Sequence, residues 1–373
     1  MEYLSPYLAW PALLSWTLVL LLPWRPWSMR EQLAARPAHK NEGAVDLSGI
    51  TVLIPARNEA DVLEATLRAL AVQGSGLKVI VVDDQSDDGT AAVAARFDFV
   101  QLLRGGQMAS GWAGKLWALE QGLAKVDTGM VLLLDADIEL RAGMLASLLR
   151  HKQSHDLHLV SVMADLQRRS VWEKLLLPAF VYFFKLIYPF SLSNSRRFKC
   201  LAAAAGGCIL VDLKVLKSVG AFASIKDALI DDCALARQVK QAGYRTWIGL
   251  SRDVVSLRAY EGLQSIWQMV ARSAFTQLHY SSAMLLLVTL IMLAVFVLPI
   301  AALFSHHPVW GLSAWLMMAV VYMPTLRYYE LPLAWSLCMP LIGSLYLAMT
   351  WHSAVRYWRG TQSIWKGRRY ARS

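Results

Sequence analysis

From Ser273 to Leu326 the chain contains no Asp, Glu, Lys or Arg. A His-Pro pair near the middle divides this run into two segments, near 283–304 and 309–326. Each segment is about 30 Å long as an α-helix, which is enough to cross the hydrocarbon core of a bilayer. A third uncharged stretch, 331–355, is interrupted by two prolines. We therefore expect a C-terminal transmembrane region over residues 281–355.

The N-terminus carries another apolar segment, because residues 3–24 are uncharged and basic residues begin at Arg25. The segment lacks the basic start and the small-residue cleavage site of a removable signal peptide. The positive charges that follow it place the next domain in the cytoplasm. Only 17% of all residues are charged, against about 25% in soluble proteins. We expect residues 1–24 to form an uncleaved signal anchor.

The C-terminal tail, residues 356–373, contains six basic residues and no acidic one. Basic residues beside apolar segments are typical of the cytoplasmic face of a membrane, and they do not indicate binding of nucleic acid. Three spans after a cytoplasmic domain would leave this tail outside. Either the last apolar stretch is re-entrant or interfacial, or the charge rule fails for this chain. Of the two sides, we expect the tail to be cytoplasmic.

A further apolar segment, residues 172–192, is interrupted by Lys185 and two prolines and is flanked by basic residues. If it crossed the membrane, the domain between the spans would be divided between its two sides. We interpret it as an interfacial amphipathic segment. The alternative is a buried helix of the domain core.

Residues 48–272 alternate between short apolar runs and segments of helical spacing. The expected strands lie near 50–54, 77–82, 99–103 and 130–134. Strands separated by helices indicate parallel βαβ units, in which ligands bind at the carboxyl ends of the strands. Acidic residues stand at two of those ends, at Asp83-Asp84 and at Asp135-Ala136-Asp137. An α/β domain with an acidic ligand site is therefore expected.

Five motifs in this domain resemble family 2 glycosyltransferases of the GT-A fold. They are TVLIPARNE (51–59), VVDDQSDDGT (81–90), the Gly-Lys pair 114–115, LDAD (134–137) and LIDDCAL (229–235), in that order. More narrowly, GWAGKLWALEQG, AAAGGCILV and WKGRRY are similar to the hopene-associated glycosyltransferases of hopanoid-producing bacteria, which are related to ceramide glucosyltransferases.

The resemblance implies a fold, ligands and a location. The fold is a GT-A, Rossmann-like domain at 48–272, flanked by transmembrane helices. The partners are a nucleotide-sugar donor, a membrane lipid acceptor of hopanoid or polyprenoid type, and the bilayer. The location is the inner membrane of a bacterium, with the domain in the cytoplasm. A divalent metal, Mg²⁺ or Mn²⁺, neutralises the leaving diphosphate in such enzymes.

Metal and donor residues follow from the motifs. Carboxylates suit a hard cation, and the resemblance gives Asp137 to the metal, with Asp135 near the ribose and also a candidate ligand. Asp83 or Asp84 contacts the base, and either assignment stays open. Arg57 pairs with a phosphate, with Glu59 or with Asp84. The donor-binding set is Pro55, Arg57, Glu59, Asp83, Asp84, Lys115, Asp135 and Arg272.

Transfer with inversion needs a carboxylate base for the acceptor hydroxyl. The family pattern makes Asp232 that base, with Asp231 in support, although simple capping of a helix start is the alternative. Gly206 and Gly207 leave room for the acceptor. The aromatic motif of many polysaccharide synthases is missing beside Arg272, where Ser273 stands instead of Trp. A processive synthase and a catalytically silent membrane scaffold remain as alternatives to a single transfer onto a lipid.

Overall fold

The computed structural model describes residues 6–36, 45–360, 364–365 and 368–369. The chain divides into two compact units. The helical unit comprises Met1–Arg30, Arg168–Ser191 and Tyr260–Thr361, and the sheet unit comprises Glu31–Gln167, Leu192–Ala259 and Gln362–Ser373. Of the predicted basic tail, residues 361–363, 366–367 and 370–373 lie outside the described part.

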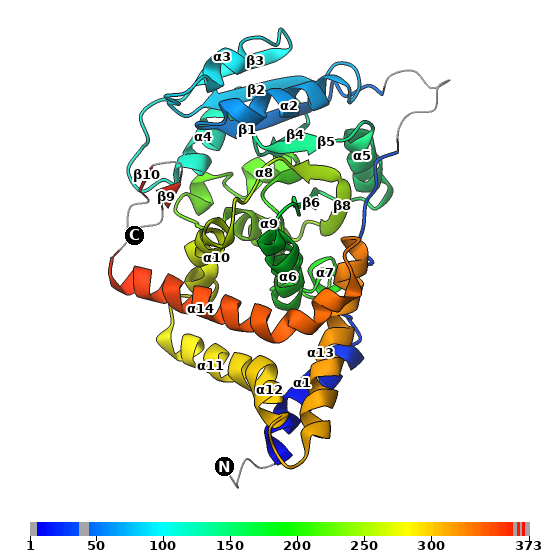
Figure 1. The fold of residues 1–373 in the computed structure, drawn as a ribbon. Coiled ribbons are helices and arrows are strands. Elements are labelled where there is room, and N and C mark those ends of the chain that lie inside the picture. Colours follow the sequence, from blue (N-terminus) through cyan, green and yellow to red (C-terminus); the bar gives the residue numbers. More distant parts are fainter. Residues whose placement is uncertain (1–5, 37–44, 361–363, 366–367, 370–373) are drawn as a thin grey trace. The chain divides into compact units, whose positions relative to one another are not determined.

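The sheet unit is built on an eight-stranded sheet of order β3-β2-β1-β4-β7-β6-β8-β5 (Figure 1). Its strands are β1 Ile50–Ala56, β2 Lys78–Asp83, β3 Val100–Arg104, β4 Met130–Leu134, β5 Ile138–Leu140, β6 Leu159–Asp165, β7 Cys208–Asp212 and β8 Thr246–Ser256. Neighbours among β1 to β4 pair in parallel, which confirms the predicted βαβ half. Strand β7 runs antiparallel to β4 and β6. β6 pairs in parallel with β8, and β5 antiparallel to β8.

Two hydrophobic cores lie on the two faces of this sheet. Strand β1 supplies both, since Val52 and Ile54 belong to one core and Leu53 to the other, as the alternation of side chains along a strand requires. The first core is covered by α2 Ala60–Ala71, α3 Thr90–Ala94 and α5 Met144–Ser154. The second is covered by α4 Gly114–Leu123, α8 Leu213–Ser218, the 3₁₀ turn Ala223–Ile225 and α9 Asp231–Gln241. Strands buried on both faces read as continuous apolar runs.

The helical unit contains the apolar segments. Its elements are α1 Trp10–Leu21, α6 Val171–Ile187, α10 Leu263–Gln277, α11 Ser282–Met292, α12 Leu298–Ala302, α13 Pro308–Tyr328 and α14 Met339–Trp358. The division in sequence between the units falls within the short α7 Phe190–Ser193. In the part of the chain that the structure describes, three helical stretches are long and apolar enough to cross a membrane: Ser282–Ala302, Pro308–Tyr328 and Leu333–Trp358. The first two coincide with the predicted segments.

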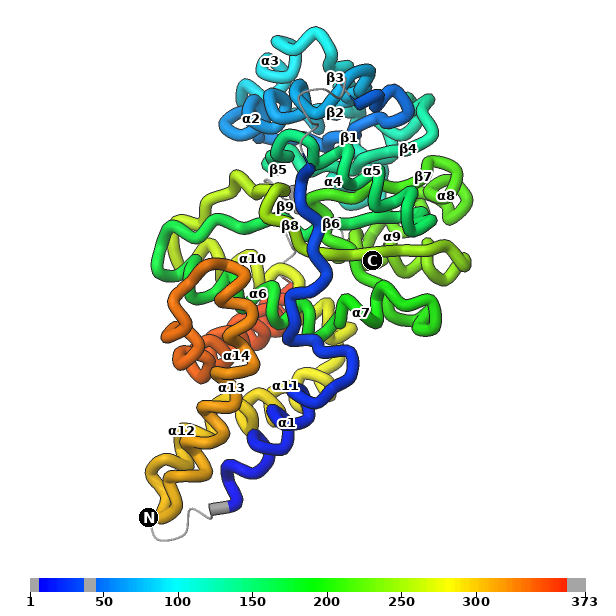
Figure 2. Tube along the Cα trace, turned by 90° about the vertical axis from the view of Figure 1, so that its right-hand side faces the viewer, coloured from blue at the N-terminus to red at the C-terminus, as the bar shows by residue number. Residues whose placement is uncertain are grey.

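The N-terminal helix is shorter than the predicted anchor. A 3₁₀ turn and α1 together cover Tyr7–Leu21. At 1.5 Å per residue this helix is about 22 Å long, less than a hydrocarbon core. It ends before Pro23, because the residue preceding a proline is disfavoured in helical conformation. Helix α1 packs beside α13, with the rings of Trp10 and Trp310 5.8 Å apart (Figure 2).

Helix α6 covers most of the segment expected at the membrane interface. It begins with a capping box in which Ser170 and Glu173 exchange side-chain and backbone hydrogen bonds. Most of its side chains are buried, and Tyr182 is fully enclosed. This burial favours the alternative of a packed helix, while Trp172 and Ile187 stay exposed. An interfacial position of the segment stays a prediction.

Candidate active site

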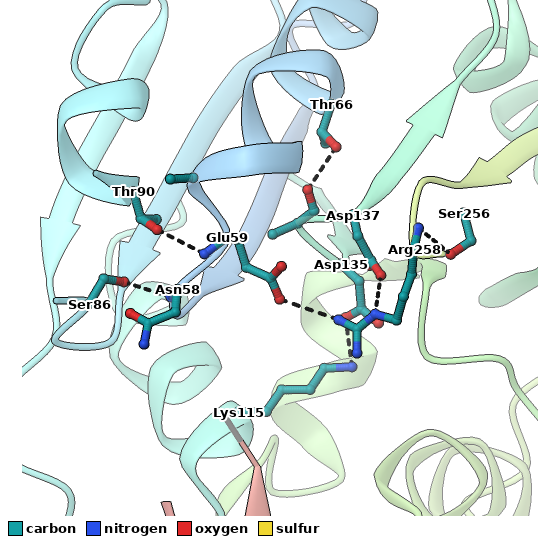
Figure 3. A network of polar contacts seen from close by, with 12 residues as sticks. Asn58, Glu59, Thr66, Ser86, Thr90, Lys115, Asp135, Asp137, Ser256 and Arg258 are labelled. Atoms are coloured by element: carbon teal, nitrogen blue, oxygen red, sulfur yellow. Dashed lines mark hydrogen bonds and ion pairs between the residues drawn. The ribbon is translucent and has the colours of Figure 1, made fainter. Parts of the chain in front are cut away.

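The loops that follow β1 and β2 are joined by hydrogen bonds from main-chain N–H groups to side-chain hydroxyl groups. The backbone N–H of Asn58 donates to Ser86 Oγ at 3.0 Å, and that of Glu59 donates to Thr90 Oγ1 at 2.9 Å (Figure 3). Asn58 has a positive φ of 51°, a conformation that asparagine tolerates better than most residues. These bonds hold the carboxyl ends of two neighbouring strands as one rigid edge.

Arg57 crosses between the same two loops. Its Nη1 donates to the backbone carbonyls of Asp84, at 2.5 Å, and Gln85, at 2.9 Å. The predicted partners were a phosphate, Glu59 or Asp84, and in the structure Nη1 contacts the main chain of Asp84 and of Gln85. The side chains of Asp83 and Asp84, at the end of β2, are 7% and 0% exposed.

A lysine at the start of α4 lies close to an aspartate that follows β4 and to another at the start of α9. The Nζ of Lys115, in the first turn of α4, lies 2.7 Å from Asp135 Oδ1 and 3.8 Å from Asp231 Oδ2. Burial alone would lower the pKa of Lys115, but the two carboxylates outweigh it and raise that pKa. Burial raises the pKa of Asp135, and Lys115 opposes that rise. Lys115 is therefore a permanent cation among acids.

Asp232 is held by backbone donors. Its Oδ2 accepts from Gly206 N at 2.8 Å, and its Oδ1 accepts from Cys233 N at 2.7 Å. Burial, and next the charge of Asp231, raise the pKa of Asp232 to about 6, although these N–H groups and Lys115 favour the carboxylate. A carboxylate with such a pKa is ionised at neutral pH and more basic than an ordinary aspartate.

A pocket brings these groups together. Its polar lining is Lys115, Asp135, Gly206, Asp231 and Asp232, beside Pro55 and an apolar floor that includes Leu116, Phe222 and Leu235. A Cβ atom added at Gly206 would lie 3.2 Å from Lys115 Nζ and 3.4 Å from Asp232 Oδ2. Gly207 lies one residue further on, and its carbonyl accepts from Asp135 N at 3.1 Å. A glycine at 206 thus keeps the space between Asp232 and Lys115 open.

Asp137 is bound by an arginine that the sequence analysis missed. Arg258 Nε donates to Asp137 Oδ2 at 2.9 Å, and its Nη2 lies 3.4 Å from Glu59 Oε1 (Figure 3). Arg258 lies two residues after the end of strand β8. A basic residue soon after a strand is the signal by which the sequence could have indicated it. Arg272, in contrast, lies on α10 in the helical unit, so its place in donor binding stays a prediction.

The carboxylates suit a divalent cation in kind. Within residues 6–36 and 45–360, no group of three or more His, Cys, Asp and Glu side chains is arranged to hold a metal ion. Mg²⁺ in nucleotide sites, however, is held by one or two carboxylates together with substrate phosphates and water. Asp135 and Asp137 provide two such carboxylates at the end of β4. These residues therefore fit a metal that shares its coordination with a diphosphate.

Known proteins resemble parts of this chain. Residues 51–220 match the family model described as glycosyl transferase family 2. A 4,4'-diaponeurosporenoate glycosyltransferase of Staphylococcus haemolyticus is 35% identical over 102 residues, 27% of each chain. Its counterpart in Staphylococcus aureus is 31% identical over 125 residues, 33% of this chain and 32% of that one. The matches thus span about a third or less of the curated relatives.

Among solved structures, a mannosyltransferase from Pyrobaculum calidifontis, in complex with GDP-Man and Mn²⁺, is similar with a TM-score of 0.57. The similarity covers 96% of this chain and 99% of that one at 18% sequence identity, so it bears on the fold. The strand order, the parallel half-sheet and this likeness confirm the predicted GT-A fold. Over residues 51–220 the chain is thus similar to family 2 glycosyltransferases.

Proposed function

We propose that this protein is an inverting glycosyltransferase that moves one sugar from a nucleotide-sugar donor to a hydroxyl group of an apolar membrane lipid. The observation that carries the proposal is Asp232. Its carboxylate is fixed by two backbone N–H groups, its pKa is raised to about 6, and it shares a pocket with Lys115. Asp232 thus has the properties of a general base, and the neighbouring ammonium of Lys115 can stabilise negative charge that develops on a leaving group.

The chemical step uses groups of that pocket. Asp232 accepts the proton of the acceptor hydroxyl while the acceptor oxygen bonds to the anomeric carbon of the sugar. The bond from that carbon to the diphosphate breaks on the opposite face, which inverts the configuration. The ammonium of Lys115 stabilises the charge of the departing diphosphate. Asp231 raises the basicity of Asp232 through its own charge.

The donor would lie along the edge formed by the β1 and β2 loops. Asp83 or Asp84 receives the nucleoside there, and Pro55, Arg57 and Glu59 shape the same edge. Asp137 and Asp135 would hold the metal, Mg²⁺ or Mn²⁺, which neutralises charge on the diphosphate when it is bound. Gly206 and Gly207 border the acceptor side.

The acceptor class rests on two observations. Among the described residues, three helical stretches of the helical unit are long and apolar enough to cross a membrane. Two relatives are named 4,4'-diaponeurosporenoate glycosyltransferases. An enzyme anchored in this way meets its acceptor in the bilayer. We propose a polyprenoid-type lipid, with hopanoids as the class that the sequence resemblance implies, and the inner membrane of a bacterium as the location.

The proposal is tested by lipid analysis of a deletion strain. We expect one glycolipid to disappear and to return when the wild-type gene is restored, but not with Asp232→Asn. The product should carry a single sugar, whereas a processive synthase would give a ladder of sizes. An unchanged lipid profile would contradict the proposal.

A further inference from the structure

The contact between Arg258 and Asp137 lies at the carboxylate best suited to the metal. Arg258 also reaches Glu59, so its guanidinium joins two acids of the donor edge. The side chains of Asp137 and Glu59 are 11% and 12% exposed, and that of Arg258 is 43% exposed (Figure 3). The arginine thus reaches from the surface onto carboxylates that are largely shielded from water.

Hydrogen bonds of the neighbouring main chain fix the position of this arginine. Leu257 N donates to the Asp137 carbonyl at 2.8 Å, and the Leu257 carbonyl accepts from Gln167 Nε2 at 3.0 Å. Arg258 N also donates to Ser256 Oγ at 3.4 Å. The two residues that precede Arg258, Ser256 and Leu257, are therefore held against the start of β5. The position of Arg258 is built into the fold of the sheet unit.

A guanidinium in this position opposes a metal ion. One oxygen of Asp137 is engaged as a hydrogen-bond acceptor, and a positive charge at this distance repels a divalent cation. A nucleoside diphosphate changes that balance, because its phosphate oxygens offer a guanidinium the paired acceptors that it prefers. The same ligand also brings oxygen atoms for the metal.

We propose that Arg258 makes metal binding depend on the donor. Without donor, Arg258 neutralises Asp137 and Glu59 and keeps the affinity for a divalent cation low. When the diphosphate enters, the guanidinium turns to it and releases Asp137 to the metal. This inference rests on the proposed function, and it makes Arg258 a positioning residue whose variants alter metal binding separately from transfer.

The test is Mn²⁺ binding to the purified full-length protein, followed by electron paramagnetic resonance of the free ion. Without nucleotide, we expect Arg258→Gln to bind Mn²⁺ at least tenfold more tightly than wild type. Addition of GDP or UDP should tighten binding strongly in wild type and much less in the variant. Adding Asp137→Asn to Arg258→Gln should remove the gained site.

Arg245→Gln is the matched control. Arg245 directly precedes strand β8, at the end of the strand opposite to Arg258. Its Nη1 lies 3.2 Å from Asp156 Oδ2. This variant loses an Arg–Asp ion pair whose carboxylate is exposed and lies away from the pocket, and it should bind Mn²⁺ as wild type does. Arg258→Lys, which keeps the charge, should stay close to wild type without nucleotide.

Equal Mn²⁺ affinity of wild type and Arg258→Gln, including no binding by either, would overturn the inference. If the wild type still glycosylates lipid under those conditions, the proposed function stands and only the role of Arg258 fails. If the wild-type protein forms no glycolipid, that result would instead count against the proposed function.

Discussion

The backbone N–H of Gly206 donates to Asp232 Oδ2 at 2.8 Å, so a glycine positions the carboxylate that we propose as the base. The same glycine borders Lys115, because a Cβ atom there would lie 3.2 Å from the ammonium nitrogen. One residue without a side chain thus sets both the orientation of the base and the room beside the cation.

Replacing Gly206 by alanine should lower kcat/KM about tenfold or more, since a displacement of a few tenths of an ångström disturbs the alignment of reacting groups. Gly129→Ala is the control, because a Cβ atom there meets no other atom within 4 Å. Steady-state transfer assays on both variants measure the difference. Equal activity of Gly206→Ala and Gly129→Ala would contradict this role.

The pH profile should report Asp232. Because the base works as a carboxylate and its pKa is raised to about 6, kcat/KM should fall tenfold per pH unit below about pH 6. Asp231→Asn removes a neighbouring charge that raises this pKa, so its acidic limb should move to lower pH. A limb at the same pH in wild type and variant would show that another group is titrating.

Lys115→Gln should weaken donor binding about tenfold or more, because the diphosphate loses its ammonium partner. The acidic limb should also move to higher pH, since Lys115 lowers the pKa of Asp232. The measurement is nucleotide binding by calorimetry together with the pH profile. Lys78→Gln, which breaks an exposed ion pair with Asp127, should change neither.

Stability of the sheet unit should depend on a different ion pair. Lys152 Nζ lies 2.7 Å from Asp212 Oδ1, and the two side chains are 10% and 26% exposed. Asp212→Ala leaves a shielded ammonium without its partner and should lower the free energy of unfolding by about 2 kcal/mol. Asp127→Ala, from the exposed pair with Lys78, should cost under about 1 kcal/mol. Urea unfolding of the two variants compares them, and equal losses would contradict the reasoning.

Most of the parallel half of the fold could be predicted from the sequence because β1, β2 and β4 are buried on both faces. The run 50–54 therefore appears as continuous apolar residues, and β4 ends directly at its acidic motif. The antiparallel strands β5 to β8 were harder to predict, because their pairing depends on contacts between distant segments.

The same limit applied to the site. Asp135 and Asp232 stand in local motifs, so sequence alone could propose them. Arg258 stands in none, and it becomes relevant only because β8 brings it beside residues more than a hundred positions away. At the N-terminus, uncharged composition alone does not show that helix α1 ends at Leu21, before Pro23.

The most direct test of the account is transfer of labelled sugar from a nucleotide donor into extracted lipid by wild-type protein and by Asp232→Asn, both reconstituted in vesicles. We predict labelled lipid with inverted anomeric configuration from wild type and a rate lower by about a thousandfold from the variant. Transfer at the wild-type rate by Asp232→Asn, or product with retained configuration, would contradict it.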